Sequence, residues 1–114
     1  MSIMTDMIDA MKEREIDAYL PGRHSGACLR PYVVVADDGV RRVGKTTGRH
    51  VFIVTAYVPM DRPTALGALI AQVKSALATV GNVRETGEQS PDEIDDELNA
   101  YCASLEYSAL CSLI

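Results

Sequence analysis

The chain has 114 residues, of which 47% are hydrophobic and 24% charged. This length suits one domain with one hydrophobic core, and we expect a single domain over residues 1–114. Acidic residues outnumber basic ones by 16 to 11, for a formal net charge of −5. An acidic surface repels nucleic-acid phosphates, so we do not expect the protein to bind nucleic acid. No stretch approaches the ~18 apolar residues of a membrane span, so we expect no membrane-spanning segment.

The cysteines and the N-terminal pattern indicate a soluble, intracellular protein. Cys28, Cys102 and Cys111 are an odd number without a C-x-x-C pair, which predicts neither a disulfide framework nor a zinc site. The apolar residues at the N-terminus are interrupted by Asp6 and Asp9, unlike those of a signal peptide. We therefore expect a reducing compartment.

The N-terminal residues predict a helix from about residue 3 to residue 20, capped by Ser2 and ended by Pro21-Gly22. Charged residues at 12–15 would face water. The apolar face at helical spacing comprises Met4, Met7, Ile8, Met11, Ile16, Tyr19 and Leu20.

The next segment predicts three strands. Residues 31–36 are β-branched and apolar, as in a covered or central strand. Asp37-Asp38-Gly39 has the composition of a hairpin turn, followed by a short return strand over 40–43 and a loop over 44–48. Residues 51–58 are mostly apolar on both faces, which predicts the central strand of the sheet.

A second helix is expected after Pro59, with Asp61 as its cap, Pro63 in its first turn and Gly81-Asn82 at its end. An apolar stripe at helical spacing supports it. The stripe comprises Leu66, Leu69, Ile70, Val73, Leu77 and Val80.

The C-terminal part predicts a short edge strand over 83–86, a turn or two of helix starting at Ser90-Pro91-Asp92-Glu93, and a strand with one polar face over 101–110. The short helix would carry Ile94 and Leu98 inward. Together these elements predict an α+β fold, with an antiparallel or mixed sheet of about four to five strands and two main helices packed on it.

Gly39-Val-Arg-Arg-Val-Gly44-Lys45-Thr46 matches the phosphate-loop pattern G-x-x-x-x-G-K-[ST]. A working phosphate loop is flexible and leads into a helix whose N-terminus points at the phosphate. Here the loop positions hold bulky valines and arginines, and Lys45 precedes the strand over 51–58. We therefore expect Lys45 on a β-turn, and nucleotide binding is the least favoured function.

Catalytic patterns are also weak. His24 and His50 are far apart in sequence and occur in no known metal or nucleophile motif. The acidic run from Asp92 to Glu97 lacks the order of a calcium loop. We expect no enzyme activity, no cofactor and no metal ion.

Two charged clusters are the candidate interface residues: basic Arg41, Arg42, Lys45 and Arg49, and acidic Asp92, Asp95 and Asp96. The simple alternative for each is a solvated surface. In a head-to-tail ring, two different patches of one subunit meet on its neighbours, so clusters of opposite charge favour a homo-oligomeric ring.

The order of the parts resembles the small tail-terminator and tail-completion proteins of long-tailed phages and prophages. The resemblance covers nearly the whole chain: an N-terminal helix, the PYVVV strand, the VFIVTAYVP strand, a helix containing VKSAL and a last strand around YCASLEYS. It rests on this layout and on short apolar phrases.

The resemblance implies a structural virion protein that is assembled in the bacterial cytoplasm. Such proteins form a ring, commonly a hexamer, that caps the tail tube and contacts the tail tube protein and the head connector. An alternative is a small ligand-binding or regulatory domain of host origin, with an apolar pocket between helix and sheet.

Overall fold

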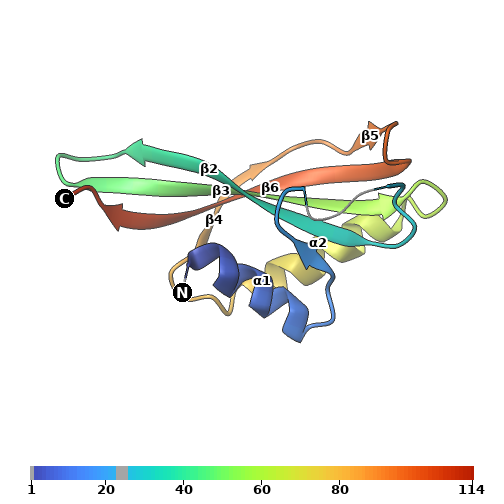
Figure 1. The fold of residues 1–114 in the computed structure, drawn as a ribbon, viewed down its shortest axis with the longest axis horizontal. Helices are drawn as coiled ribbons and strands as arrows, with labels where there is room; N and C mark the ends of the chain where they lie inside the picture. Colours follow the sequence, from blue (N-terminus) through green and yellow to red (C-terminus); the bar gives the residue numbers. More distant parts are fainter. Residues whose placement is uncertain (1, 23–25) are drawn as a thin grey trace.

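The computed structural model describes residues 2–22 and 26–114, in which two helices cover one face of a six-stranded mixed sheet (Figure 1). The sheet order is β1-β2-β3-β6-β4, with β5 beside β6; β1 and β2 are parallel and the other pairs antiparallel. The α+β prediction is confirmed, with slightly more strands than expected. The elements are α1 (Ile3–Glu13), β1 (Ala18–Tyr19), β2 (Tyr32–Arg42), β3 (Thr47–Pro59), α2 (Ala65–Leu77), β4 (Arg84–Gln89), β5 (Glu93–Asp95) and β6 (Ala100–Ser112).

The core lies between the helices and one face of the sheet. As predicted, β3 is central, between β2 and β6. Its side chains Phe52, Val54, Ala56 and Val58 are buried in the core, together with the expected α2 stripe from Leu66 to Leu77. On the opposite face, Tyr57 packs on a smaller cluster formed by Cys28, Tyr32 and Ala100. Both faces of the central strand are thus partly covered.

The first helix is shorter than predicted. Ser2 caps it, because its side chain accepts a hydrogen bond from the Thr5 N–H. The helix ends at Glu13, and Glu15 takes a left-handed φ of 61° that turns the chain away. Residues beyond this turn form β1 beside β2, with Ala18 buried. The apolar residues between 16 and 20 are therefore compatible with a strand, although their spacing also matches a helix.

The second helix is confirmed, but its predicted ends are wrong. It begins at Ala65 with Thr64 as N-cap residue, and no side chain caps it. Asp61 lies outside the helix, because Pro59 and Arg62 already form a turn in which the Arg62 N–H donates to the Pro59 carbonyl. The helix ends at Leu77, before Gly81.

Asp37-Asp38-Gly39 is a β-bulge and not the predicted hairpin turn. The strand β2 continues through it, and Val40–Arg42 pair with the same strand, β3, as Val33–Asp37 do. The Asp37 carboxylate accepts the Gly39 N–H at 2.8 Å, and Gly39 has φ +88°. The motif therefore uses the positive φ of glycine to bulge the strand, and the chain reverses later, over residues 43–46.

The helix predicted after Ser90 is also wrong, because the segment forms strand β5. Ser90 does not cap a helix: its hydroxyl accepts the Ser104 N–H at 2.8 Å, and its own N–H donates to the Ser104 carbonyl at 2.9 Å. These bonds hold the segment against β6. Ile94 is consequently 53% exposed, and Leu98 is half-buried. The strands predicted over 83–86 and 101–110 are confirmed as β4, at the sheet edge, and β6.

Candidate functional site

One end of the sheet projects beyond the helices as a narrow arm (Figure 1). We define the arm as residues 38–50, from β2, β3 and the turn between them, together with residues 109–112 of β6. The longest dimension of the molecule is 48 Å, against 26 and 24 Å in the other two directions. The arm therefore extends beyond the part of the sheet that the helices cover, and its surface is available for contact with another molecule.

All four predicted basic interface residues lie on the arm and are exposed. Arg41 and Arg49 face each other across β2 and β3, and Arg41 forms an ion pair with Asp38 at 2.9 Å. The Arg42 side chain donates to the carbonyls of Gly44 and Lys45 at 3.1 and 2.7 Å, which braces the turn. The two arginines of β2 thus stiffen the arm while they remain accessible to a partner.

The arm also exposes apolar side chains that the sequence prediction misses. Val40 and Val43 are 47% and 49% exposed, and Leu110 is 74% exposed. Their exposure is not predicted, because valines in a predicted strand are normally assigned to the core. Their position next to arginines could have indicated it, since the apolar residues of a buried strand rarely alternate with charged residues.

The base of the arm is held by Asp37 and His50, whose Oδ2 and Nε2 atoms lie 2.9 Å apart. The His50 ring also packs on Phe52, with ring centroids 4.3 Å apart. The Gly39 N–H bond, followed by the bond from His50, lowers the pKa of Asp37 below its ordinary value. This His50 pair therefore has a structural role at the bulge.

The predicted acidic residues lie on and beside β5. Asp92 and Asp96 are exposed, as are their neighbours Glu93 and Glu97. Asp95 is half-buried, and its carboxylate accepts the Leu98 N–H at 3.1 Å. Ile94 is an exposed apolar residue within this acidic segment, whereas the sequence predicts it in the core.

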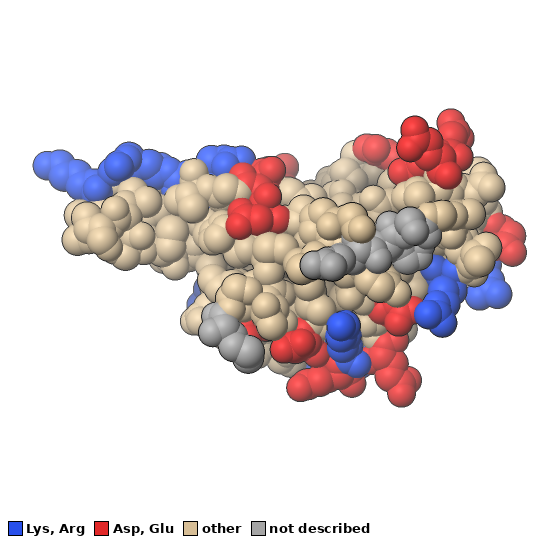
Figure 2. Space-filling model, in the orientation of Figure 1, with Lys and Arg blue, Asp and Glu red and all other residues tan. Residues whose placement is uncertain are grey.

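Within one chain the basic and acidic clusters are far apart. Figure 2 shows lysines and arginines along the arm at one end of the long axis, and a cap of acidic residues over β5 at the other end. The clusters therefore do not form one site in a single molecule. Each is available to another molecule, and their opposite charges can meet between copies.

The phosphate-loop match has no phosphate-loop geometry. Gly39 lies in the bulge, Val40 and Arg42 pair with β3, and Lys45 lies in the turn that leads to β3. A helix N-terminus, which supplies N–H groups to a bound phosphate, does not follow Lys45. The prediction that Lys45 lies on a turn is therefore confirmed.

The remaining candidate chemical groups are dispersed. His24 lies outside the described residues. In residues 2–22 and 26–114, no three or more histidine, cysteine or acidic side chains are grouped so that they could hold a metal ion. Cys28, Cys102 and Cys111 are free thiols. Burial, and then Asp95 and Glu93, raise the pKa of the Cys102 thiol, which disfavours its reactive thiolate form.

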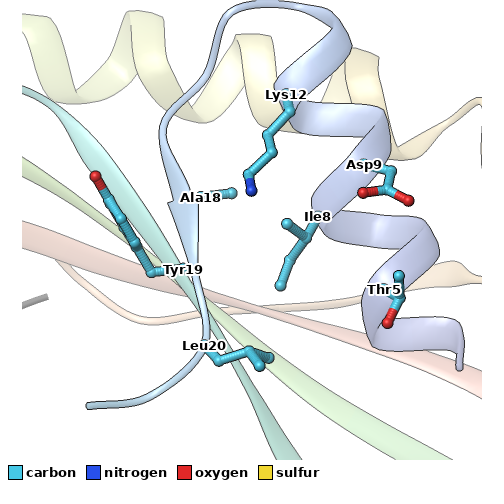
Figure 3. A pocket seen from close by; sticks show the side chains of 7 residues that line it. All are labelled: Thr5, Ile8, Asp9, Lys12, Ala18, Tyr19 and Leu20. Carbon is cyan, nitrogen blue, oxygen red and sulfur yellow. The ribbon is translucent and has the colours of Figure 1, made fainter. Parts of the chain in front are cut away.

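A shallow groove of about 310 Å³ lies between α1 and β1 (Figure 3). Ile8 from α1 and Ala18 and Leu20 from the β1 segment line its apolar part. Asp9 and Lys12 also extend from α1, and in Figure 3 the Lys12 side chain reaches toward Ala18. The groove lies between a helix and the sheet, where the pocket of a ligand-binding domain is expected.

Among the described residues, no helix is both long and apolar enough to span a lipid bilayer. Comparison with protein-family models and with curated proteins finds no match for this chain.

Proposed function

We propose that this chain is a self-assembling structural protein whose copies join head to tail into a ring that caps the tail tube of a phage. One observation carries the proposal: an elongated domain presents a basic arm at one end and an acidic surface at the other (Figure 2). Two different surfaces that attract each other lead to head-to-tail contacts, and such contacts produce rings when the rotation between copies closes.

The charges serve mainly to select the partner surface and its register. An exposed ion pair contributes only about 0–1 kcal/mol, and salt screens it. The exposed apolar residues Val40, Val43 and Ile94 supply surface whose burial adds affinity. We therefore expect an assembly that weakens as salt increases and forms at high protein concentration.

The phage setting is supported by the resemblance to tail-terminator proteins. In that setting the ring, a hexamer in the usual case, is a virion component made in the bacterial cytoplasm, and its partners are the tail tube protein and the head connector. The proposal assigns no catalytic activity, cofactor, nucleic-acid ligand or membrane partner to the chain.

The second candidate function is a small ligand-binding or regulatory domain of host origin. The groove between α1 and β1 favours it, because apolar and charged side chains line the groove together (Figure 3). Such a domain would bind a small molecule there as a monomer or dimer.

Light scattering over a range of concentration and salt separates the two candidates. The ring proposal predicts a molar mass that is a multiple of 12.4 kDa above the dimer, decreasing as salt is added. A protein that stays monomeric at the highest attainable concentration, and also when tail tubes are added, would contradict the ring and favour the binding domain.

A further inference from the structure

Among the described residues, the sheet has strand edges without a neighbouring strand. On one side β1 covers β2 at Val33 and Val34, so the part of β2 in the arm has β3 on one side and no strand on the other. On the opposite side β5 pairs with β6 and has no strand beyond it. Strand edges of this kind can pair with another chain.

The directions of these strands suit pairing between copies. β2 is antiparallel to β3, β3 to β6, and β6 to β5. β2 and β6 therefore run one way, and β3 and β5 run the other way. If two copies have the same orientation, β2 of one copy is antiparallel to β5 of the next.

The faces of the two edges also correspond. In the arm, Val40 pairs with His50 of β3, and His50 pairs with Ala109 of β6. Arg42 pairs in the same way with Gly48, and Gly48 with Cys111. All these residues lie on the face of the sheet that carries the helices. Since side chains alternate regularly along β6, Ile94, opposite Tyr101, lies on this same face.

On the other face, Arg41 pairs with Arg49, and Arg49 with Leu110. Glu93 is opposite Cys102 in β6, which lies on the Leu110 face. An edge-to-edge junction between equally oriented copies thus brings Val40 and Ile94 together on one face and Arg41 and Glu93 together on the other.

We propose that the arm of one copy adds as a strand to β5 of the next copy, with Val40 opposite Ile94. This inference rests on the proposed head-to-tail assembly and specifies its junction. The register that pairs Val40 with Ile94 also places Arg41 opposite Glu93 and aligns Arg42 with Asp92, which directly precedes β5. These pairs are favourable, whereas Asp38, in the bulge of β2, aligns with Asp96.

The occupant of the β5 edge is a second copy of this chain, in head-to-tail arrangement. A two-fold pairing of one β2 arm with another would instead bring the arginine pairs of the two arms together, and like charges on facing strands repel. Because the arm and β5 lie at opposite ends of the molecule (Figure 1), the junction displaces neighbouring copies along their strands. A ring accommodates this displacement when its strands are inclined to the ring axis.

Disulfide trapping between two single-cysteine variants tests the register. Cross-strand Cβ atoms are about 4.5–5.5 Å apart, close enough for a disulfide after a small adjustment. The variants Val40→Cys and Ile94→Cys are made in a background with Cys28→Ala, Cys102→Ser and Cys111→Ser, and are mixed under mild oxidation. The matched control mixes Leu110→Cys with Ile94→Cys, because Leu110 is also exposed on the arm but lies on the other face.

We expect the first mixture to yield linked dimers at least ~10-fold faster than the control, and the Val40→Cys variant alone to yield few. Assembly of the wild type without preferential Val40–Ile94 linkage would overturn this register and leave the ring proposal standing. Efficient linkage within the Val40→Cys variant alone would indicate two-fold pairing and would also overturn it. A wild type that never assembles would overturn the proposed function and this inference together.

If the cysteine-substituted background does not fold, a charge exchange in the otherwise unchanged chain replaces the trapping experiment. Arg41→Glu alone and Glu93→Arg alone are each expected to weaken self-association by about threefold to fivefold, the size of one exposed ion pair. An equimolar mixture of the two is expected to recover more association than either alone. A mixture of Arg41→Glu with the double variant Arg41→Glu/Glu13→Arg, which reverses an exposed acid outside the junction, is not. Equal recovery in both mixtures would contradict the pairing of Arg41 with Glu93.

Discussion

Nε2 of His50 lies 2.9 Å from Oδ2 of Asp37, across the point at which β2 bulges and enters the arm. The other oxygen of the same carboxylate accepts the Gly39 N–H at 2.8 Å. One side chain thereby joins the bulge to the neighbouring strand β3. The pair therefore links β2 and β3 at the base of the arm.

The first prediction concerns acid stability. Since the bonds from Gly39 and His50 lower the pKa of Asp37, its carboxylate stabilises the folded state above the ordinary unfolded pKa, and this contribution disappears as pH falls through the lower folded value. Asp37→Asn should therefore lower the thermal midpoint at neutral pH, and its difference from the wild type should shrink below about pH 4. Asp61→Asn, at an exposed position, is the control. A difference that stays constant with pH would show that the charge of Asp37 does not hold the bulge.

The second prediction compares two glycines. Gly39 has φ +88°, so Gly39→Ala should destabilise the chain by about 1 kcal/mol through backbone strain. Gly67 lies on the exposed side of α2, and no atom lies within 4 Å of the position that a Cβ would occupy there, so Gly67→Ala should stabilise the chain by about 0.5–1 kcal/mol. Urea denaturation measures both. Changes of the same sign would contradict the assignment of Gly39 to a strained bulge.

The third prediction concerns the core between α2 and the sheet. Leu77 is fully buried, so Leu77→Ala should cost about 2–4 kcal/mol through lost burial and a residual cavity. Val73→Ala should cost less, because fewer atoms are removed. Leu110→Ala, on the exposed arm, should change stability by less than about 0.5 kcal/mol in the dilute protein. An unchanged urea midpoint for Leu77→Ala would mean that the stripe does not pack on the sheet.

The fourth prediction concerns the phosphate-loop match. Lys45 lies in the β2–β3 turn, so Lys45→Ala should leave the thermal midpoint unchanged, and calorimetry with magnesium and ATP should detect no binding to either protein. Micromolar binding that is lost in Lys45→Ala would contradict this geometry.

The sequence is most informative where apolar residues are long and periodic. The stripe of α2 and the strands around Val54 and Leu105 are found as predicted, because burial of an extended apolar face leaves few alternatives. The predictions fail where one residue pattern is compatible with two kinds of secondary structure. The spacing of Ile16, Tyr19 and Leu20 matches a helix, but Ala18 and Tyr19 pair with β2 as a short strand.

Two further errors have a tertiary cause. Asp37-Asp38-Gly39 provides the same local conformation to a hairpin and to a bulge, and continued pairing with β3 selects the bulge. The local sequence predicts that Ser90 caps a helix, yet its hydroxyl bonds to Ser104 in β6 instead. The exposure of the basic residues Arg41, Arg42, Lys45 and Arg49 could be predicted from the sequence, because charged side chains rarely enter a core. The exposure of Val40 and Ile94 could not, because apolar residues in a strand are normally assigned to the core.

Sedimentation of complementary charge variants tests the head-to-tail assembly most directly. One variant carries Arg41→Glu and Arg42→Glu on the arm, and the other carries Asp92→Lys and Asp96→Lys, at exposed positions of the acidic end. Each variant alone brings like charges together and should remain largely monomeric, whereas their equimolar mixture restores attraction at every junction. We expect assemblies in the mixture at a concentration at which neither variant assembles. A mixture that sediments as monomers, while the wild type assembles under the same conditions, would contradict it.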